Sequence, residues 1–400
     1  MSEQLAIHGG TPVRKTKIDY GRQWITKEDT EAVAETLLSD FITTGPKVAE
    51  AEQRLCELTG ARHAVLVANG TAALHAACAA AGIGAGDEVI TTPLTFMASA
   101  NCALYVGARP VFADIDAETY NIDPASIEAH ITDKTKAVVA VDFTGQAVDL
   151  DAIRAICDRH HLTLIEDAAH SIGTAYHGKK VGSIADLTCF SFHPVKTVTA
   201  GEGGAVLTND DDLYHRALLF RGHGIEREES GMVNLPREGI WVYEQQMLGY
   251  NYRMTDFQAA LLISQLNRLD QFSARRKEIV KRYDEAFCDM EEITLQKEIP
   301  ASDTTRHLYV IQLNLEKLTC TRAEFFEAMS AENVQCQVHY LPVYYSPFYE
   351  SLGYRKGLCP QAGRLYERIM SIPLYPMMSD EDVEDVICAV RKVACAYRMP

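Results

Sequence analysis

Seven short apolar runs, which alternate with helical patterns along the first half of the chain, limit the fold more than any other feature of the sequence. Turn residues bound each run, and the runs cover residues 63–68, 88–91, 110–115, 137–143, 163–166, 187–192 and 205–208. Helical patterns separate most of them, at residues 72–81, 95–106, 124–130 and 150–160. Short all-apolar strands that alternate with helices are typical of a mainly parallel sheet with both faces covered. The sequence therefore predicts an α/β domain around a seven-stranded, mainly parallel sheet.

Helical and mixed patterns flank this region on both sides. Before it, Thr26 is a candidate N-cap with Asp29 at the third helical position, and a second helix is expected to end near Gly60. After it, a helix is expected over residues 211–221 and a long one from 255 to about 287, whose apolar stripe is Leu261, Leu262, Leu266, Leu269 and Phe272. Beyond about residue 305 the pattern predicts a strand, a helix, a strand and a helix, at residues 307–313, 322–332, 334–340 and 379–397.

These patterns divide the chain into three expected parts. Residues 1–250 hold an N-terminal segment and the large α/β domain, residues 251–290 form a long linking helix, and residues 291–400 form a small α+β domain.

Charge and cysteine content exclude several classes of protein. The formal net charge of −17, from 55 acidic and 38 basic residues, argues against nucleic acid or an anionic membrane as the main partner. The 11 cysteines are scattered through apolar segments without a Cys-x-x-Cys pair, which favours free thiols in a reducing compartment over a metal site or disulfides. Because neither a signal-peptide pattern nor an apolar run of membrane-spanning length is visible, we expect a cytoplasmic protein.

Lys196 is the first candidate for chemistry. It lies in Phe-Ser-Phe-His-Pro-Val-Lys-Thr, between an apolar strand and the glycine-rich turn Gly-Glu-Gly-Gly-Ala, and has no charged residue within five positions. Apolar surroundings lower the pKa of an amine, which an amine that attacks a carbonyl at neutral pH requires. The alternative is a loop lysine that extends to solvent.

Two further candidates follow strands at their carboxyl ends, where open parallel sheets bind ligands. Gly70 and Thr71 join a strand to a helix, and the unpaired amides of a helix N-terminus bind phosphate, although an ordinary N-cap would have the same sequence. Phe96 is placed to stack on a planar ring, or else it packs in the core.

Asp167 ends a fully apolar strand, where a carboxylate is costly to bury without a partner. A protonated pyridine nitrogen is such a partner and turns the ring into an electron sink, whereas backbone amides would also satisfy the carboxylate. Ser191, five residues before Lys196, can donate its hydroxyl to the same phosphate, and Asn251 is a loop side chain with no evident structural task. Together and in this order, these residues fit pyridoxal 5′-phosphate (PLP).

The same stretches carry a family resemblance. Gly-Thr-Ala-Ala-Leu, Glu-Asp-Ala-Ala-His, Ser-Phe-His-Pro-Val-Lys, Gly-Glu-Gly-Gly-Ala and Gly-Tyr-Asn-Tyr-Arg-Met resemble the DegT/DnrJ/EryC1/StrS sugar aminotransferases over residues 15–395. The resemblance implies the aspartate-aminotransferase-like (type I) fold and a PLP cofactor bonded to Lys196, with Asp167 at the ring nitrogen. It also implies that Gly70, Thr71 and Ser191 hold the phosphate, Phe96 stacks on the ring and His170 lies near the ring's phenolic oxygen. Asn251 would reach the phosphate in the neighbouring subunit of a homodimer.

Within the family, the chain is most similar to the pseudaminic acid branch, through Tyr-Gly-Arg-Gln, Thr-Thr-Gly-Pro and Gln-Val-His-Tyr-Leu-Pro-Val-Tyr. By this resemblance the amino group moves from L-glutamate to C4 of a UDP-linked 4-keto-6-deoxy-N-acetylhexosamine, and the substrate residues are Tyr20, Thr43, His339 and Tyr340. Similar stretches occur in relatives with other sugars, so a different nucleotide-linked keto-sugar stays open, as do the roles of His193 and Glu202. A sugar 3-dehydratase would replace the lysine by histidine, and an idle PLP-binding homologue is the remaining alternative.

Overall fold

The computed structural model describes residues 4–234 and 236–400. Its centre is a seven-stranded sheet in the order β1-β9-β8-β5-β4-β2-β3, as the sequence predicts. Strand β9 is antiparallel to both neighbours, and the other neighbouring pairs are parallel. The strands are β1 (His63–Val67), β2 (Glu88–Thr91), β3 (Arg109–Phe112), β4 (Thr135–Val141), β5 (Thr163–Asp167), β8 (Leu187–Ser191) and β9 (Gly204–Thr208).

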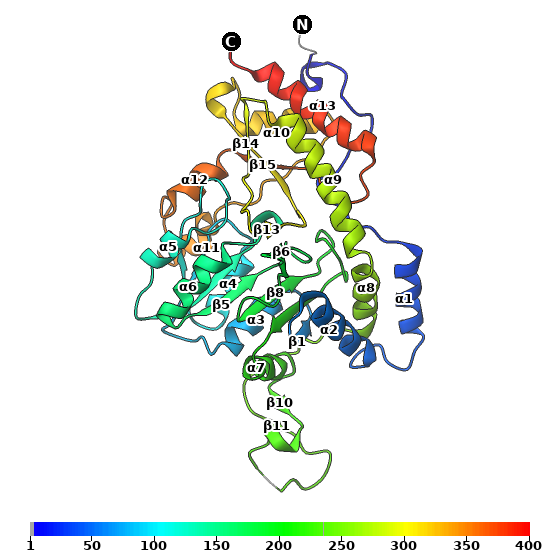
Figure 1. The fold of residues 1–400 in the computed structure, drawn as a ribbon, viewed down its shortest axis with the longest axis vertical. Helices are drawn as coiled ribbons and strands as arrows, with labels where there is room; N and C mark the ends of the chain where they lie inside the picture. Colours follow the sequence, from blue (N-terminus) through cyan, green and yellow to red (C-terminus); the bar gives the residue numbers. More distant parts are fainter. Residues whose placement is uncertain (1–3, 235) are drawn as a thin grey trace.

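Helices cover both faces of this sheet (Figure 1). Alternate residues of each strand enter two apolar clusters: Leu164 packs on one side and Ile165 on the other, so the strands are apolar throughout rather than in alternation. The large-domain helices are α2 (Pro46–Thr59), α3 (Gly70–Ala80), α4 (Ala98–Tyr105), α5 (Pro124–Ala129), α6 (Leu150–His160) and α7 (Asp211–Arg221). Among the described residues, no helix has both the length and the apolar character needed to cross a membrane.

Local capping explains where the first helices begin and end. Helix α1 (Lys27–Leu37) starts with a capping box in which the Thr26 amide donates to Asp29. Helix α2 begins with Pro46 in its first turn and ends at Gly60, whose φ of 77° only glycine adopts without cost.

The single long helix expected over residues 255–287 is wrong. The chain forms α8 (Asp256–Leu266) and α9 (Leu269–Phe287), separated at Asn267 and Arg268. The guanidinium of Arg268 donates to the Trp24 carbonyl at 3.0 Å and to Asp29 at 2.5 Å, which ties the break to helix α1. Apolar periodicity continues through the break, so the sequence pattern alone does not reveal it.

The C-terminal part is an α+β unit with its own apolar cluster. Its three-stranded antiparallel sheet has the order β12-β14-β15. Strand 334–340 is another wrong prediction, because in this stretch only Val334 and Gln337 form isolated bridges. The elements are β12 (Ile293–Leu295), β14 (Tyr309–Leu313), β15 (Ile369–Ile372), α10 (Arg322–Ala331), α11 (Pro347–Ser351), α12 (Pro360–Tyr366) and α13 (Asp380–Tyr397).

Helix α9 runs from the large sheet into this C-terminal cluster, where the C-terminal helix α13 also lies (Figure 1). Leu5 and Ile18 of the N-terminal segment (residues 4–26) pack in the same cluster. A small sheet in the order β13-β6-β7 adds a second connection, through β6 (Ala175–Tyr176), β7 (Lys179–Lys180) and β13 (Ser302–Asp303). The division of the chain at residues 250 and 290 stays a prediction.

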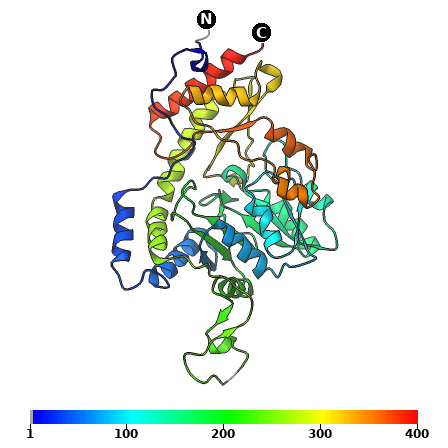
Figure 2. The same ribbon diagram turned by 180° about the vertical axis from the view of Figure 1, so that it is seen from behind.

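A hairpin arm projects from the opposite end of the molecule (Figures 1 and 2). It comprises residues 225–234 and 236–245, with the short strands β10 (Ile225–Glu226) and β11 (Glu244–Gln245) at its base. Val233, Ile240 and Trp241 on this arm are each more than two thirds exposed.

Candidate active site

A cavity of about 490 Å³ lies between the carboxyl ends of the sheet strands and the C-terminal part. This volume is within the range of small-molecule sites. Ten of the residues predicted from the sequence line it: Tyr20, Gly70, Thr71, Phe96, Asp167, His170, Ser191, Lys196, His339 and Tyr340. Residues up to 320 positions apart in the sequence thus meet at one place.

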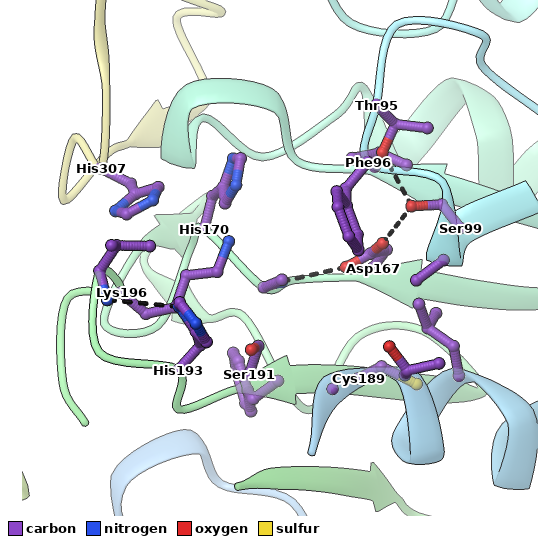
Figure 3. Close-up of a pocket in the computed structure, with 18 of the residues that line it drawn as sticks. Thr95, Phe96, Ser99, Asp167, His170, Cys189, Ser191, His193, Lys196 and His307 are labelled. Carbon is purple, nitrogen blue, oxygen red and sulfur yellow. Dashed lines mark hydrogen bonds between the residues drawn. The ribbon is translucent and has the colours of Figure 1, made fainter. Parts of the chain in front are cut away.

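Lys196 projects into this cavity from the loop after β8 (Figure 3). The loop is fixed by its own backbone: the Lys196 amide donates to the His193 carbonyl at 2.9 Å, and the Ala200 amide returns to the Phe192 carbonyl. Burial lowers the pKa of the Lys196 amine to about 8, while the negative charge of Asp167 acts in the opposite direction. The alternative that the sequence also allowed, a loop lysine that extends to solvent, is therefore wrong.

Asp167 is held by a chain of hydroxyl groups (Figure 3). Its Oδ2 accepts from Ser99 Oγ at 2.6 Å, and its Oδ1 accepts from the Ala169 amide at 3.2 Å. Because the single proton of Ser99 is donated to Asp167, the 2.8 Å contact between Thr95 and Ser99 requires Thr95 to be the donor. Burial raises the pKa of Asp167, and the Ser99 hydrogen bond counteracts this. The donors that point at the carboxylate therefore favour its charged form against the effect of burial.

The N-terminus of α3 forms another wall. Asn69 caps the helix by accepting from the Ala72 amide at 2.8 Å, while no hydrogen bond to the Gly70 and Thr71 amides comes from the described residues. A Cβ on Gly70 would lie 2.8 Å from the Ser191 Cβ, so only glycine lets α3 approach the end of β8 this closely. Two free amides and the Ser191 hydroxyl thus surround one space, as an anion site needs.

Phe96 shows that the cavity has an apolar side. Its ring is 61% exposed, although the protein core is adjacent, and it lines the cavity. A core residue would be covered, so the alternative of a packing role does not apply to Phe96.

The remaining wall is aromatic and comes from distant parts of the chain. His170 lies 4.4 Å from His307 between ring centroids, and the Tyr340 hydroxyl is 3.3 Å from His170 Nε2. Burial lowers the pKa of His170 well below its ordinary value, with the positive charge of Lys196 adding to the effect, so the ring is neutral at neutral pH. Tyr20 of the N-terminal segment completes this wall, and its ring centroid lies 5.4 Å from that of His339.

Several lining residues were not assigned a role from the sequence. Ser99 and Thr95 are four positions apart, a spacing that places side chains side by side on one helical turn and offered a signal. His307 follows His170 by more than a hundred residues, and nothing in the sequence relates the two. His193 and Glu202, whose roles the sequence left open, both line the cavity.

Two predicted residues lie outside the cavity of this chain. Thr43 forms an isolated bridge with Thr255, and Asn251 forms one with Gly222. Both are exposed, so the structure does not bring either side chain to Lys196.

Comparison with known proteins identifies the family. The model of the DegT/DnrJ/EryC1/StrS aminotransferase family matches residues 23–391. The chain belongs to this family. It is 43% identical to the spore coat polysaccharide biosynthesis protein SpsC of Bacillus subtilis, over 94% of this chain and 97% of that protein. It is 38% identical to the UDP-4-amino-4,6-dideoxy-N-acetyl-beta-L-altrosamine transaminase of Campylobacter jejuni, over 92% and 95%.

Solved structures agree with this membership. The Helicobacter pylori aminotransferase PseC, involved in the biosynthesis of pseudaminic acid, superimposes with a TM-score of 0.88 at 32% identity, over 96% of this chain and all of that chain. The PLP-form of the putative sugar aminotransferase Spr1654 from Streptococcus pneumoniae also gives 0.88, at 30% identity, over 95% and 99%. The predicted type I fold and the predicted nucleotide-sugar aminotransferase are therefore confirmed.

Proposed function

We propose that this family member transfers an amino group from L-glutamate to C4 of a UDP-linked 4-keto-6-deoxy-N-acetylhexosamine, a step of pseudaminic acid biosynthesis. The observation that carries the proposal is the 38% identity to the Campylobacter jejuni transaminase over nearly the whole of both chains. The similarity to PseC supports the same sugar.

PLP fits the cavity residues. The amides of Gly70 and Thr71 and the Ser191 hydroxyl would hold its phosphate, and the exposed ring of Phe96 would stack on its pyridine ring. The Asp167 carboxylate would face the ring nitrogen, since its fixed donors leave a negative charge to pair with a protonated nitrogen. When bound, the cofactor supplies an electron sink for the carbon that loses its proton.

The residues that line the cavity would have separate roles in the reaction. Lys196 Nζ would be the group that holds the cofactor covalently, and its free amine would act as the general acid–base that takes a proton from the substrate carbon and gives it back. A pKa of about 8 leaves about a tenth of the amine neutral near pH 7, far more than an ordinary lysine provides. Neutral His170 would orient the oxygen side of the ring, while Tyr20, His339 and Tyr340 would contact the nucleotide sugar.

The active unit in this proposal is a cytoplasmic homodimer. Asn251 is exposed and lies outside the cavity of its own chain, which suits a side chain that reaches the phosphate in the second subunit. Thr43 is placed similarly, so we assign it to the substrate site across the same interface.

The test is a two-stage spectroscopic assay. Purified protein with PLP is first mixed with L-glutamate, which should bleach the visible absorbance of the lysine-bound cofactor. Candidate keto-sugars are then added, and the UDP-linked 4-keto-6-deoxy-N-acetylhexosamine should restore the band fastest. Restoration only by a TDP-linked or a 3-keto sugar would assign the enzyme to another substrate, and no visible band at all would leave an idle homologue.

A further inference from the structure

Two carboxyl groups lie buried directly behind the cavity, on the far side of the sheet. In the parallel register, Glu166 of β5 pairs with Ala140 of β4 and with Thr188 of β8. Val141, Asp167 and Cys189, one position further along each strand, all line the cavity. Because successive side chains point to opposite faces, Glu166 points away from the cavity, as does Asp142 two positions after Ala140.

The surroundings of these two carboxyls offer too few hydrogen-bond donors. Both side chains are fully buried, on the face where Ala140, Leu164 and Phe190 form the apolar core. Glu166 Oε2 accepts from Thr188 Oγ1 at 3.1 Å, whereas its Oε1 has no partner among the described residues. Asp142 is two positions beyond the register partner of Glu166 on this same face, where a side chain as long as glutamate reaches it, and the two carboxyls act on each other; no described cation pairs with either group. Two carboxylates in contact in an apolar core require a proton between them.

Asp142 is also tied to the catalytic side of the sheet. Its amide donates to the Asp167 carbonyl at 3.1 Å. Its carboxyl accepts from the Val148 amide at 3.0 Å and from Ser171 Oγ at 2.5 Å, and Ser171 directly follows His170. Asp142 thus holds the backbone at Asp167 through its amide, and the turn that carries His170 through its carboxyl.

We propose that Glu166 and Asp142 share one proton and act as positioning residues, which hold Asp167 and His170 in place from behind the sheet. Glu166 donates the proton to Asp142, so that the pair carries one negative charge rather than two. That Asp167 and His170 need to be held against a cofactor rests on the proposed function, whereas the shared proton does not.

The electrostatics agree with this geometry. Burial raises the pKa of Glu166 well above its ordinary value, and the charge of Asp142 adds to the effect. Burial also raises the pKa of Asp142, to about 7. The titratable groups that act on the pair are on the opposite face of the sheet, Asp167 on the same strand and Cys189 on β8. An acidic neighbourhood without cations keeps one proton in the pair.

The decisive test uses the cofactor-free protein. In infrared spectra at neutral pH, the parent should show the C=O stretch of a protonated carboxylic acid, and Glu166→Gln should remove it. The control Glu285→Gln, an exposed position on α9, should leave the band unchanged. Absence of a carboxylic acid band that depends on Glu166 would overturn the proposal, whatever the enzyme's substrate proves to be.

A second readout is the pH dependence of stability. If Glu166 is protonated, the folded chain keeps a proton that the unfolded chain releases above pH 4.5, the ordinary pKa of glutamate. The free energy of unfolding therefore falls as the pH rises past 4.5. Glu166→Gln removes this loss, and its stability relative to the parent should increase steadily from acid to neutral pH. A difference that does not change with pH would contradict the shared proton.

The positioning role is tested in the loaded enzyme. Glu166→Ala, which leaves Asp142 without its partner, should lower kcat about 100-fold with little change in KM, because small displacements of reacting groups have effects of this size. Glu166→Gln has an amide that donates to Asp142 and accepts from Thr188, so it should stay within about threefold of the parent. Equal losses in both variants would overturn the positioning role even if the infrared result stands.

Discussion

The two sides of the cavity are built in different ways. The side that we propose for the cofactor is made by contiguous motifs, which lie within a few residues of the ends of β1, β2, β5 and β8. The side that we propose for the substrate is made by Tyr20, His307, His339 and Tyr340, which come from the N-terminal segment and two separate C-terminal loops. The cofactor side therefore depends on the sheet and the helices packed on it, whereas the substrate side depends on how the C-terminal part packs against the sheet. Variants on the two sides should therefore fail in different ways.

The largest effect is expected on the cofactor side. Lys196→Ala removes the amine that we propose binds the cofactor and moves the proton, so transamination should fall by at least about 10⁴-fold. The fold should be intact, because the change removes a buried amine rather than an apolar contact. Visible absorbance with PLP and single-turnover bleaching by L-glutamate measure both points. The exposed Lys179→Ala serves as the control, and near-normal turnover in Lys196→Ala would exclude the assigned role.

Asp167→Asn comes next. The amide has the same shape but does not carry the charge that pairs with a protonated ring nitrogen, so kcat should fall by about 10³-fold in the glutamate half-reaction. Binding of PLP should persist, since Lys196 and the α3 N-terminus are unchanged. Rapid-mixing absorbance with L-glutamate measures the rate, with the exposed Asp158→Asn as the control. A loss of less than about tenfold would contradict the electron-sink role.

A smaller loss is expected for Ser99→Ala. The Ser99 hydrogen bond lowers the pKa of Asp167, so its removal raises that pKa and protonates the carboxylate at a higher pH. The acid limb of the pH–rate profile should move toward neutral pH, with a loss of about tenfold at the slightly acid end. Ser126→Ala, whose hydroxyl contacts only the Asp114 amide, is the matched control. An acid limb that does not move would mean that Ser99 does not act on Asp167.

The smallest effect is expected on the substrate side. Buried Glu332 accepts from the Ala6 and Val13 amides at 2.9 and 2.8 Å and pairs with Lys392, which holds the N-terminal segment that carries Tyr20. Glu332→Gln should loosen this segment and raise KM for the nucleotide sugar about threefold, while the glutamate half-reaction stays unchanged. Steady-state KM values for both substrates, with the exposed Glu384→Gln as control, distinguish the two sides. Equal changes in both half-reactions would show that the two sides are not independent.

The same difference explains what the sequence predicts well. The seven strands and the residues at their carboxyl ends are local: an apolar run ends, a polar residue follows, and parallel strands bring those ends together. Lys196, Asp167, Gly70 and Ser191 can therefore be predicted as cavity residues from the sequence alone.

What the sequence missed depends on long-range contacts. The break at Asn267 and Arg268 is set by Asp29 and Trp24, which lie far away in the chain. The expected strand at residues 334–340 has the right apolar pattern, but the chain there turns into the cavity and pairs only at single bridges. His307 reaches His170 only because the C-terminal part packs on the sheet. Tertiary packing determines each of these three features, and local periodicity in the sequence does not reveal them.

The N-terminal segment also sets an order of events during synthesis. Ala6 is hydrogen-bonded to Glu332, 326 residues later in the chain. At ordinary ribosomal speeds, the synthesis of these residues takes roughly 15 to 60 seconds. All seven strands of the large sheet lie within residues 63–208, so that sheet can form on the ribosome while residues 4–20 are still without their C-terminal partners. The last contacts to form are then the ones that bring Tyr20 to the cavity. A nascent chain that already holds the cofactor side is thus unable to complete its substrate side until the C-terminal part has emerged.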